Sequence, residues 1–265
     1  MRYWGKNIEI DGRYYKTAMA KGHGFFPGED NIEKFETTVQ GLLRAIETKS
    51  TVGRIIVQAI NRSSRKLRII PLTIAERYGP TSRGTWPVAT KDAAASPKSF
   101  NVCYVGMPCY IGTGGGSDIV LNYEPYSWDG FDTMIGHDPG GDQQPDDVLL
   151  HELVHCLRMM RGQFAKYTVA GPFVDSEELL AVMIRNMYVA QMGREKSLQA
   201  RYGPLVFQTM TGSWFKTVAD FYHDHEAVIE QFCKEMPDIC NPFGAMVGFW
   251  NPFRARAVTK ANPMP

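Results

Sequence analysis

The segment DDVLLHELVHCLRMMRG, from Asp146 to Gly162, carries two histidines four residues apart, with a glutamate directly after the first. Gln144 and Pro145 precede it; proline suits the first position of a helix, and acidic residues in the first turn complement the helix dipole. Gly162 is a natural stop. The pattern therefore predicts a mostly apolar helix that starts at Pro145 and ends before Gly162.

On such a helix, His151 and His155 project from the same face, one turn apart, where two imidazoles can bind one metal ion. Glu152 would lie beside that ion without being a ligand. This is the H-E-x-x-H arrangement, in which zinc polarises a carbonyl and the glutamate takes a proton from water as general base. The competing interpretation is a core helix with satisfied histidines. With six histidines in 265 residues, a chance match arises on the order of once in a hundred such chains, so we favour the metal site.

A catalytic zinc needs a third protein ligand. The segment DSEELLAV begins a helix at Asp175, and downstream candidates are Glu177, Glu178, His223 and His225. Asp175 as N-cap with Glu178 three residues later would also make an ordinary capping box. In favour of a ligand, the following LLAVMIRNMYVAQM is so apolar that the helix must be buried, and a carboxylate at its head needs a partner. His223 and His225 do not share a helix face, so we do not expect them to bind a metal jointly.

The other periodic segments predict an α+β domain, with strands and helices segregated rather than alternating. Helices are expected over 31–48, with Asn31 as N-cap, and over 51–61, 176–192 and 217–236. Strands are expected in RKLRIIPLT, FNVCYVG and SDIVLNYEP. We expect loops over 78–99 and 129–145, and an irregular tail over 241–265, which holds four prolines. The prediction is one domain over 1–265, with a catalytic core at about 31–240, a small mixed sheet and a mostly helical C-terminal half.

Composition sets limits on function. The chain is 44% hydrophobic and 22% charged, with a formal net charge of +1, so no global field marks a nucleic-acid or membrane partner. No apolar run approaches the ~20 residues needed to span a bilayer, and the first residues do not form a signal peptide pattern. The basic run NRSSRKLR lacks interleaved aromatic residues and is expected to be a solvated turn.

The five cysteines do not follow the spacing of a structural zinc site. We expect Cys156 to be a buried thiol. Cys103 with Cys109, and Cys233 with Cys240, are close enough in sequence to pair in an oxidising compartment. Free thiols are the default expectation.

HELVH followed by an EEL helix resembles the zinc metallopeptidases that bacteria secrete as effectors, the NleD-type effectors and related toxin domains. These share the glutamate-zincin plan with thermolysin and the clostridial neurotoxin light chains. Upstream, the turn T-x-x-G-R at Thr51–Arg54, the strand RKLRIIP and the glycine-rich segment GTGGGSDIVLNYEP follow the order typical of the family. Together these features cover roughly residues 35 to 195.

The resemblance implies a zincin-like fold with one Zn²⁺ per chain, bound by His151 and His155, with Glu152 as the base. Glu178 matches the second glutamate of the Glu-Glu-Leu motif and would be the third ligand, with Glu177 just outside the ligand set. Where family members often have Arg and Thr after the leucine, this chain has Leu180 and Ala181. The candidates for stabilising the tetrahedral intermediate are Arg201, Tyr202, Tyr222 and His223.

In zincins the strand before the active helix often forms the sheet edge that pairs with the substrate. Here that strand would consist of Asp118, Ile119, Val120, Leu121, Asn122 and Tyr123. The implied function is a zinc endopeptidase that cleaves a protein or peptide of a host or competitor cell. It would be a virulence effector or toxin, secreted by a specialised machine without a signal peptide, with a secretion chaperone, carrier or immunity protein as partner. The alternatives are a zincin-like binding protein without proteolysis and a cytoplasmic housekeeping metallopeptidase.

Overall fold

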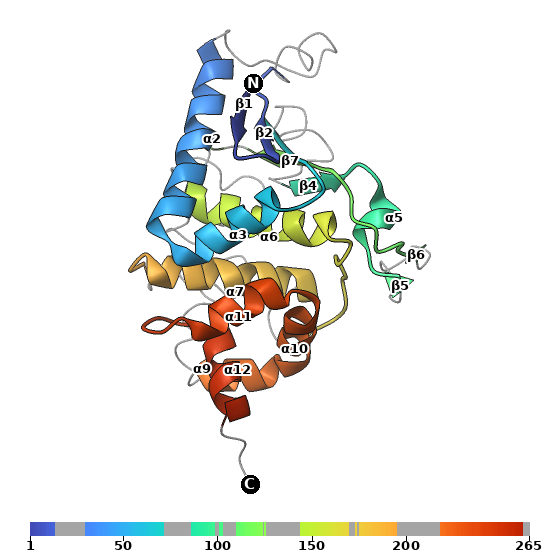
Figure 1. The fold of residues 1–265 in the computed structure, drawn as a ribbon, viewed down its shortest axis with the longest axis vertical. Helices are drawn as coiled ribbons and strands as arrows, with labels where there is room; N and C mark the ends of the chain where they lie inside the picture. Colours follow the sequence, from blue (N-terminus) through green and yellow to red (C-terminus); the bar gives the residue numbers. More distant parts are fainter. Residues whose placement is uncertain are drawn as a thin grey trace.

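A computed structural model describes residues 1–13, 30–71, 86–98, 101–102, 110–123, 125, 144–169, 173, 175–194 and 218–261. Within these ranges the fold is mixed α and β, with one small five-stranded sheet and a mostly helical C-terminal half (Figure 1). The strands are β1 (Arg2–Trp4), β2 (Ile8–Ile10), β3 (Leu67–Pro71), β4 (Trp86–Ala89), β5 (Asn101–Val102), β6 (Tyr110–Ile111) and β7 (Ile119–Tyr123). The helices are α2 (Asp30–Lys49), α3 (Thr51–Asn61), α5 (Asp92–Ala95), α6 (Pro145–Met160), α7 (Ser176–Gln191), α9 (Val218–Asp224), α10 (Glu226–Glu235), α11 (Pro237–Ala245) and α12 (Pro252–Ala261).

The sheet has the strand order β1-β2-β3-β7-β4, and β5 pairs with β6 in a separate two-stranded sheet. The three central strands, β2, β3 and β7, are parallel, while β1 and β4 run antiparallel to their neighbours. Ile69 of β3 lies opposite Leu121 of β7, and both are fully buried. Arg68, between the buried Leu67 and Ile69 of β3, is exposed, so the start of this strand alternates between a core face and a face open to solvent.

The expected edge position of the strand Asp118–Tyr123 is wrong. The strand itself is confirmed as β7, but it lies between β3 and β4 and pairs with both. The strand at this end of the described sheet is β4, from a segment that we expected to be loop and that also contains α5. Pro87 cannot donate a ladder hydrogen bond, and an outermost strand is where a sheet tolerates proline. The Pro-rich composition of this segment concealed a four-residue strand.

The glycine-rich segment before β7 packs against the C-terminal end of α6. Gly116 has a φ of +69°, and a Cβ atom there would lie 2.0 Å from the carbonyl oxygen of Met160. The backbone N–H of Ser117 donates to the carbonyl oxygen of Met159 (3.3 Å). Gly162, with a φ of +68°, meets the same loop. The glycines thus let two backbones approach closely and join the strand to the helix.

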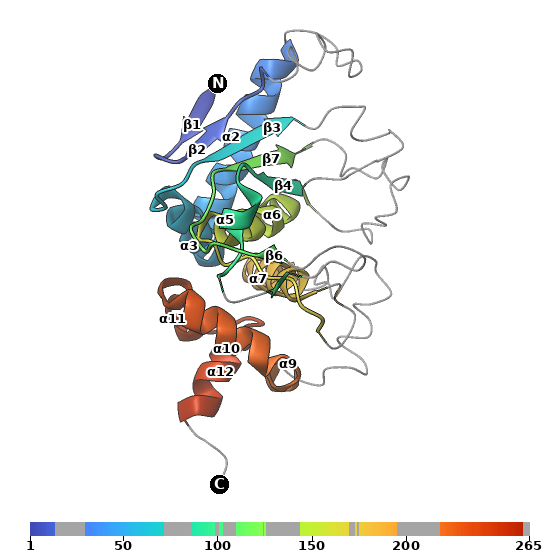
Figure 2. The ribbon, with the colours of Figure 1, turned by 90° about the vertical axis from the view of Figure 1, so that its right-hand side faces the viewer.

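Helices α6 and α7 lie side by side in the middle of the molecule (Figures 1 and 2). Helix α6 contacts β4 and β7, and α3 contacts α2, α6 and α7. One hydrophobic cluster extends from Leu121 in the sheet through Leu153 of α6 and Met183 of α7 to Phe232 of α10. In the described part of the chain, no helix is long and apolar enough to cross a bilayer.

The C-terminal region departs from the prediction in two ways. The helix predicted over 217–236 is interrupted at His225, between α9 and α10. The tail predicted to be irregular includes the end of α11 and all of α12. Pro237 and Pro252 are the first residues of α11 and α12, where the fixed φ of proline and its missing N–H are compatible with a helix. The irregular tail was expected because of its prolines, and Pro252 is one of them.

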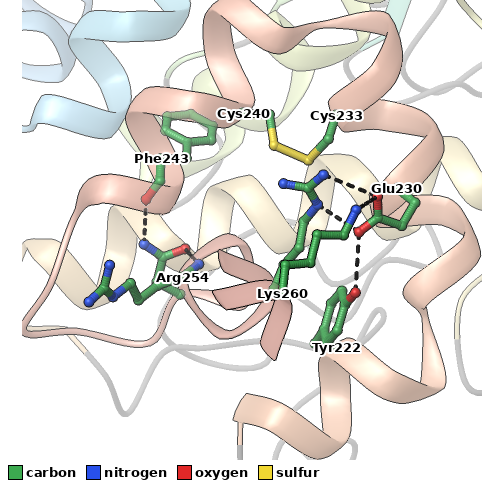
Figure 3. Close-up of a disulfide and its surroundings, with 9 residues drawn as sticks. Tyr222, Glu230, Cys233, Cys240, Phe243, Arg254 and Lys260 are labelled. Atoms are coloured by element: carbon green, nitrogen blue, oxygen red, sulfur yellow. Dashed lines mark hydrogen bonds and ion pairs between the residues drawn. A yellow bond between two sulfur atoms is a disulfide. The ribbon is translucent and has the colours of Figure 1, made fainter. Parts of the chain in front are cut away.

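Cys233 and Cys240 form a disulfide that joins α10 to α11, with Cα atoms 5.0 Å apart (Figure 3). The default expectation of free thiols is therefore wrong for this pair. Cys156 is a buried free thiol, as expected. Cys103 and Cys109 lie outside the described residues.

Candidate metal centre

The two histidines lie on a helix whose limits agree with the sequence pattern. Helix α6 begins at Pro145, with Gln144 as N-cap, and the backbone N–H of Gln144 donates to the carboxylate of Asp147 (3.2 Å). The left-handed Gly162 follows the C-cap residue. Both histidines therefore belong to a continuous stretch of helix and share one face.

The side chains of His151, His155 and Glu178 converge. The Nε2 atoms of the two histidines are 3.1 Å apart, and the ring centroids are 4.8 Å apart. Glu178 Oε2 lies 3.4 Å from Nε2 of His151, and Glu178 Oε1 lies 3.4 Å from Nε2 of His155. One possible ligand atom from each side chain lies within 4.8 Å of the others. Two imidazole nitrogens and a carboxylate in this arrangement could hold one metal ion.

Asp175 explains why the Glu178 carboxylate reaches the histidines. As N-cap of α7, its Oδ1 accepts hydrogen bonds from the backbone N–H groups of Glu177 (2.9 Å) and Glu178 (3.0 Å). The backbone donors of the first turn are thereby satisfied by the cap itself. The N-cap half of the predicted capping box is confirmed. The Glu178 carboxylate is instead directed to the histidines of α6.

The electrostatics of the cluster favour a positive charge between the three side chains. Burial alone would lower the pKa of His155, but the hydrogen bond and the charge of Glu178 outweigh it and raise this pKa to about 9. Burial would raise the pKa of Glu178, but the hydrogen bonds from both histidines hold it well below its usual range. In the metal-free form an imidazolium supplies the cation, and a metal ion satisfies the same requirement when bound.

Glu152 follows His151 on α6 and is 9% exposed. Burial raises the pKa of its carboxyl group, and the two neighbouring histidines oppose this shift. A carboxylate with a raised pKa is a better proton acceptor near neutral pH than an ordinary surface glutamate. Glu152 is thus a buried carboxyl group close to the candidate ligand set, and its role as a base stays a prediction.

Glu177 is fully buried, and its carboxylate is directed away from the histidines, toward Arg158. The Nε of Arg158 donates to both carboxylate oxygens of Glu177, each at 2.8 Å. The backbone N–H of Ala165 donates to Oε1 at 2.8 Å. Glu177 is therefore held just outside the ligand set, where the family resemblance had placed it.

The four candidates for stabilising the tetrahedral intermediate have separate outcomes. Arg201 and Tyr202 lie outside the described residues. Among the C-terminal helices, the hydroxyl of Tyr222 donates to Glu226 (3.0 Å) and to Glu230 (3.2 Å; Figure 3). His223 is exposed on α9. A role in stabilising the intermediate stays a prediction for Tyr222 and His223. The hydrogen bonds of Tyr222 join residues of the C-terminal helices.

Sequence reasoning did not identify Arg158, although a signal was present. It is a charged residue on an otherwise apolar stretch, three positions after His155. A buried arginine requires carboxylate or carbonyl partners, so its place on an apolar helix was a signal that such groups lie opposite it. Strand β4 was missed for the reason given above, its short length in a Pro-rich segment.

No protein-family model matches the chain, and no curated protein matches it. The assignment of chemistry to this centre therefore rests on the motif and on the geometry.

Proposed function

We propose that this protein is a zinc-dependent endopeptidase. The observation that carries the proposal is the convergence of His151, His155 and Glu178, from two helices, beside the buried Glu152. Zinc accepts such a nitrogen and oxygen ligand set. A bound zinc ion would supply Lewis acidity toward a peptide carbonyl and toward a water molecule.

Glu152 is the residue that moves protons. It accepts a proton from the attacking water and delivers it to the amide nitrogen as the C–N bond breaks. One water molecule is consumed, and the products are a carboxylate and an amine. The raised pKa of Glu152 suits both halves of this transfer, because the group must take up a proton and then release it within one turnover.

The position of β4 supports binding of an extended peptide. This strand contacts α6, and one of its edges pairs with β7. Among the described strands, none pairs with its other edge. Val88 of β4 is 41% exposed. An extended peptide that adds to the free edge of β4 would make main-chain hydrogen bonds and lie next to the helix with the metal ligands.

The biological setting follows from the motif resemblance alone. By that resemblance the enzyme would be a bacterial effector or toxin that reaches a target cell through a specialised secretion machine. The second candidate function is a zincin-like binding protein. The intact Glu152 favours the enzyme, because a protein that only binds has no use for a general base beside the metal.

The test compares the native chain with Glu152→Gln after zinc loading. We expect about one zinc per chain in both proteins, and cleavage of a proteome-derived peptide library, followed by mass spectrometry, only with the native chain. Chelation should abolish the native activity, and added zinc should restore it. Zinc-loaded native protein that cleaves nothing, or Glu152→Gln with undiminished cleavage, would refute the endopeptidase.

A further inference from the structure

Arg158 connects the metal centre to two other parts of the chain. It lies on α6, three residues after His155, and is 3% exposed. Its Nε donates to Glu177 of α7 (2.8 Å), and its Nη1 donates to Oε2 of Glu235 of α10 (3.1 Å). Its Nη2 donates to the carbonyl oxygen of Gln163, in the segment after α6 (2.6 Å). All three guanidinium nitrogens therefore have a partner.

The contact with Glu177 sets the direction of Glu178. Consecutive residues on an α-helix project about 100° apart, so a first turn that is anchored through Glu177 cannot rotate without moving Glu178. The anchor is two-sided, because the N–H of Ala165 also donates to Glu177 (2.8 Å). Nearby, the hydroxyl of Ser176 donates to the carbonyl oxygen of Ala165 (2.6 Å).

The same contact decides which carboxylate is left to take a cation. Glu177 and Glu178 are adjacent carboxylates at the head of one buried helix. Arg158 neutralises Glu177, and the carboxylates of Glu177 and Glu235 raise the pKa of the guanidinium although burial opposes this. Glu178 then remains as the carboxylate that faces the two histidines.

The contact with Glu235 brings the C-terminal helices into the arrangement. Glu235 is the last residue of α10, and Met236 separates it from α11. Both lie between the two cysteines of the Cys233–Cys240 disulfide. The side-chain amide of Gln163 also donates to the carbonyl oxygen of Glu235 (2.9 Å). Arg158 is thus held by the C-terminal helices as well as by Glu177.

We propose that Arg158 is a positioning residue of the metal centre, which fixes Glu178 toward His151 and His155 by holding Glu177. This proposal rests on the metal site of the proposed function and not on peptide cleavage. Mutating a residue that contacts and orients a metal ligand typically lowers metal affinity by about 10- to 100-fold.

Arg185 is a matched control within the same pair of helices. It is also 3% exposed, and it lies on α7 and pairs with the buried Asp147 of α6 (3.1 Å). It therefore joins α6 to α7 as Arg158 does, but it lies about two helical turns beyond Glu178. Losing this pair should lower stability without turning Glu178.

The experiment uses the full chain and its variants Arg158→Lys, Glu177→Gln and Arg185→Lys. Zinc affinity is measured by competition with a chromophoric chelator, the visible spectrum is recorded with Co²⁺ in place of zinc, and melting temperature reports stability. We expect Arg158→Lys and Glu177→Gln each to weaken zinc binding about tenfold or more and to alter the Co²⁺ spectrum. Because both substitutions break the same contact, their effects should not add: the double variant should bind zinc about as tightly as the single variant with the lower affinity. The zinc affinity of Arg185→Lys should stay within about threefold of the native value, while its melting temperature should be lower.

Native zinc affinity and Co²⁺ spectrum in Arg158→Lys would overturn the proposal, as would an equal loss of affinity in Arg185→Lys. If Arg158→Lys does not fold, Glu177→Gln decides by the same criteria. A native chain that binds neither ion would overturn the metal centre and this proposal together. Zinc binding without peptide cleavage would remove only the endopeptidase.

Discussion

Glu177 and Glu178 are adjacent in the chain, but their carboxylates face different partners. That of Glu177 is paired with Arg158 at 2.8 Å, whereas that of Glu178 lies 3.4 Å from Nε2 of both His151 and His155. The helical rotation between neighbouring residues separates them. One carboxylate fixes the helix, and the other is available to a metal ion.

Replacing Glu178 by alanine removes the only carboxylate in the candidate ligand set. Two imidazoles on one helix remain, so we expect zinc affinity to fall about 100-fold or more. Chelator competition and elemental analysis after zinc reloading measure the effect. Glu33→Ala, at an exposed position on α2, is the control and should bind zinc like the native chain. Full zinc retention in Glu178→Ala would assign the third ligand elsewhere.

Zinc affinity should depend on pH because His155 must lose a proton before it binds the ion. In the metal-free form the pKa of His155 is raised from 6.5 to about 9 by Glu178, against the effect of burial. Apparent affinity should therefore rise about tenfold per pH unit between about pH 7 and pH 8.5. In Glu178→Gln the imidazole loses its carboxylate partner, so the slope over this range should be much smaller. A flat profile for the native chain would contradict the proton displacement.

The stability of the metal-free protein should show the opposite trend. The folded pKa of His155, about 9, lies above its ordinary value of 6.5. The protonated form therefore stabilises the fold fully below about pH 6.5, and this contribution is lost as the pH rises through about 9. Urea unfolding of chelator-treated protein should show a falling free energy of unfolding across this window. His155→Gln should remove that part of the dependence, and an unchanged profile in this variant would refute the assignment to His155.

Gly116→Ala should destabilise the protein strongly. The left-handed φ of +69° costs an L-residue about 1–2 kcal/mol, and relieving the clash with the Met160 carbonyl adds about 1–3 kcal/mol. We expect a loss of roughly 2–5 kcal/mol in urea unfolding. Gly193→Ala has a similar φ of +71° but no described atom within 4 Å of the new Cβ, so it should lose only the conformational part. Equal losses in both variants would show that the contact with α6 does not matter.

Removing the Cys233–Cys240 disulfide should cost about 2–3 kcal/mol of unfolding free energy, the loop-closure entropy of the short segment that it closes. The comparison is between the native chain and Cys233→Ala/Cys240→Ala, unfolded in urea without a reductant. With dithiothreitol present the two proteins should become nearly equal. Alkylation of the unreduced native chain at four or more of its five cysteines, counted by mass spectrometry, would contradict a bond between these two residues.

Local pattern was enough to predict the helix that holds His151, Glu152 and His155. Its start at Pro145 and its stop at Gly162 depend on residues within the helix or next to it, and the histidine spacing is a property of the helix itself. The N-cap role of Asp175 was predictable for the same reason. These features need no information from elsewhere in the chain.

The position of β7 in the sheet and the presence of the disulfide could not be predicted from local sequence patterns. A strand is an edge or a centre only by virtue of its neighbours, and the neighbour that makes β7 central is a short strand in a segment that reads as loop. A proline looks the same in the sequence whether it breaks a helix or begins one, so the prolines of the tail did not reveal its helix.

The sequence by itself determined that two histidines and a base share one helix, since a four-residue spacing has a single outcome on a helix. The family resemblance predicted Glu178 rather than Glu177 as the third ligand, but only the tertiary structure shows that Glu178 is the carboxylate that faces the two histidines. The two side chains are chemically identical, and what separates them is Arg158, which is 19 positions away from Glu177 and meets it only when α6 packs against α7.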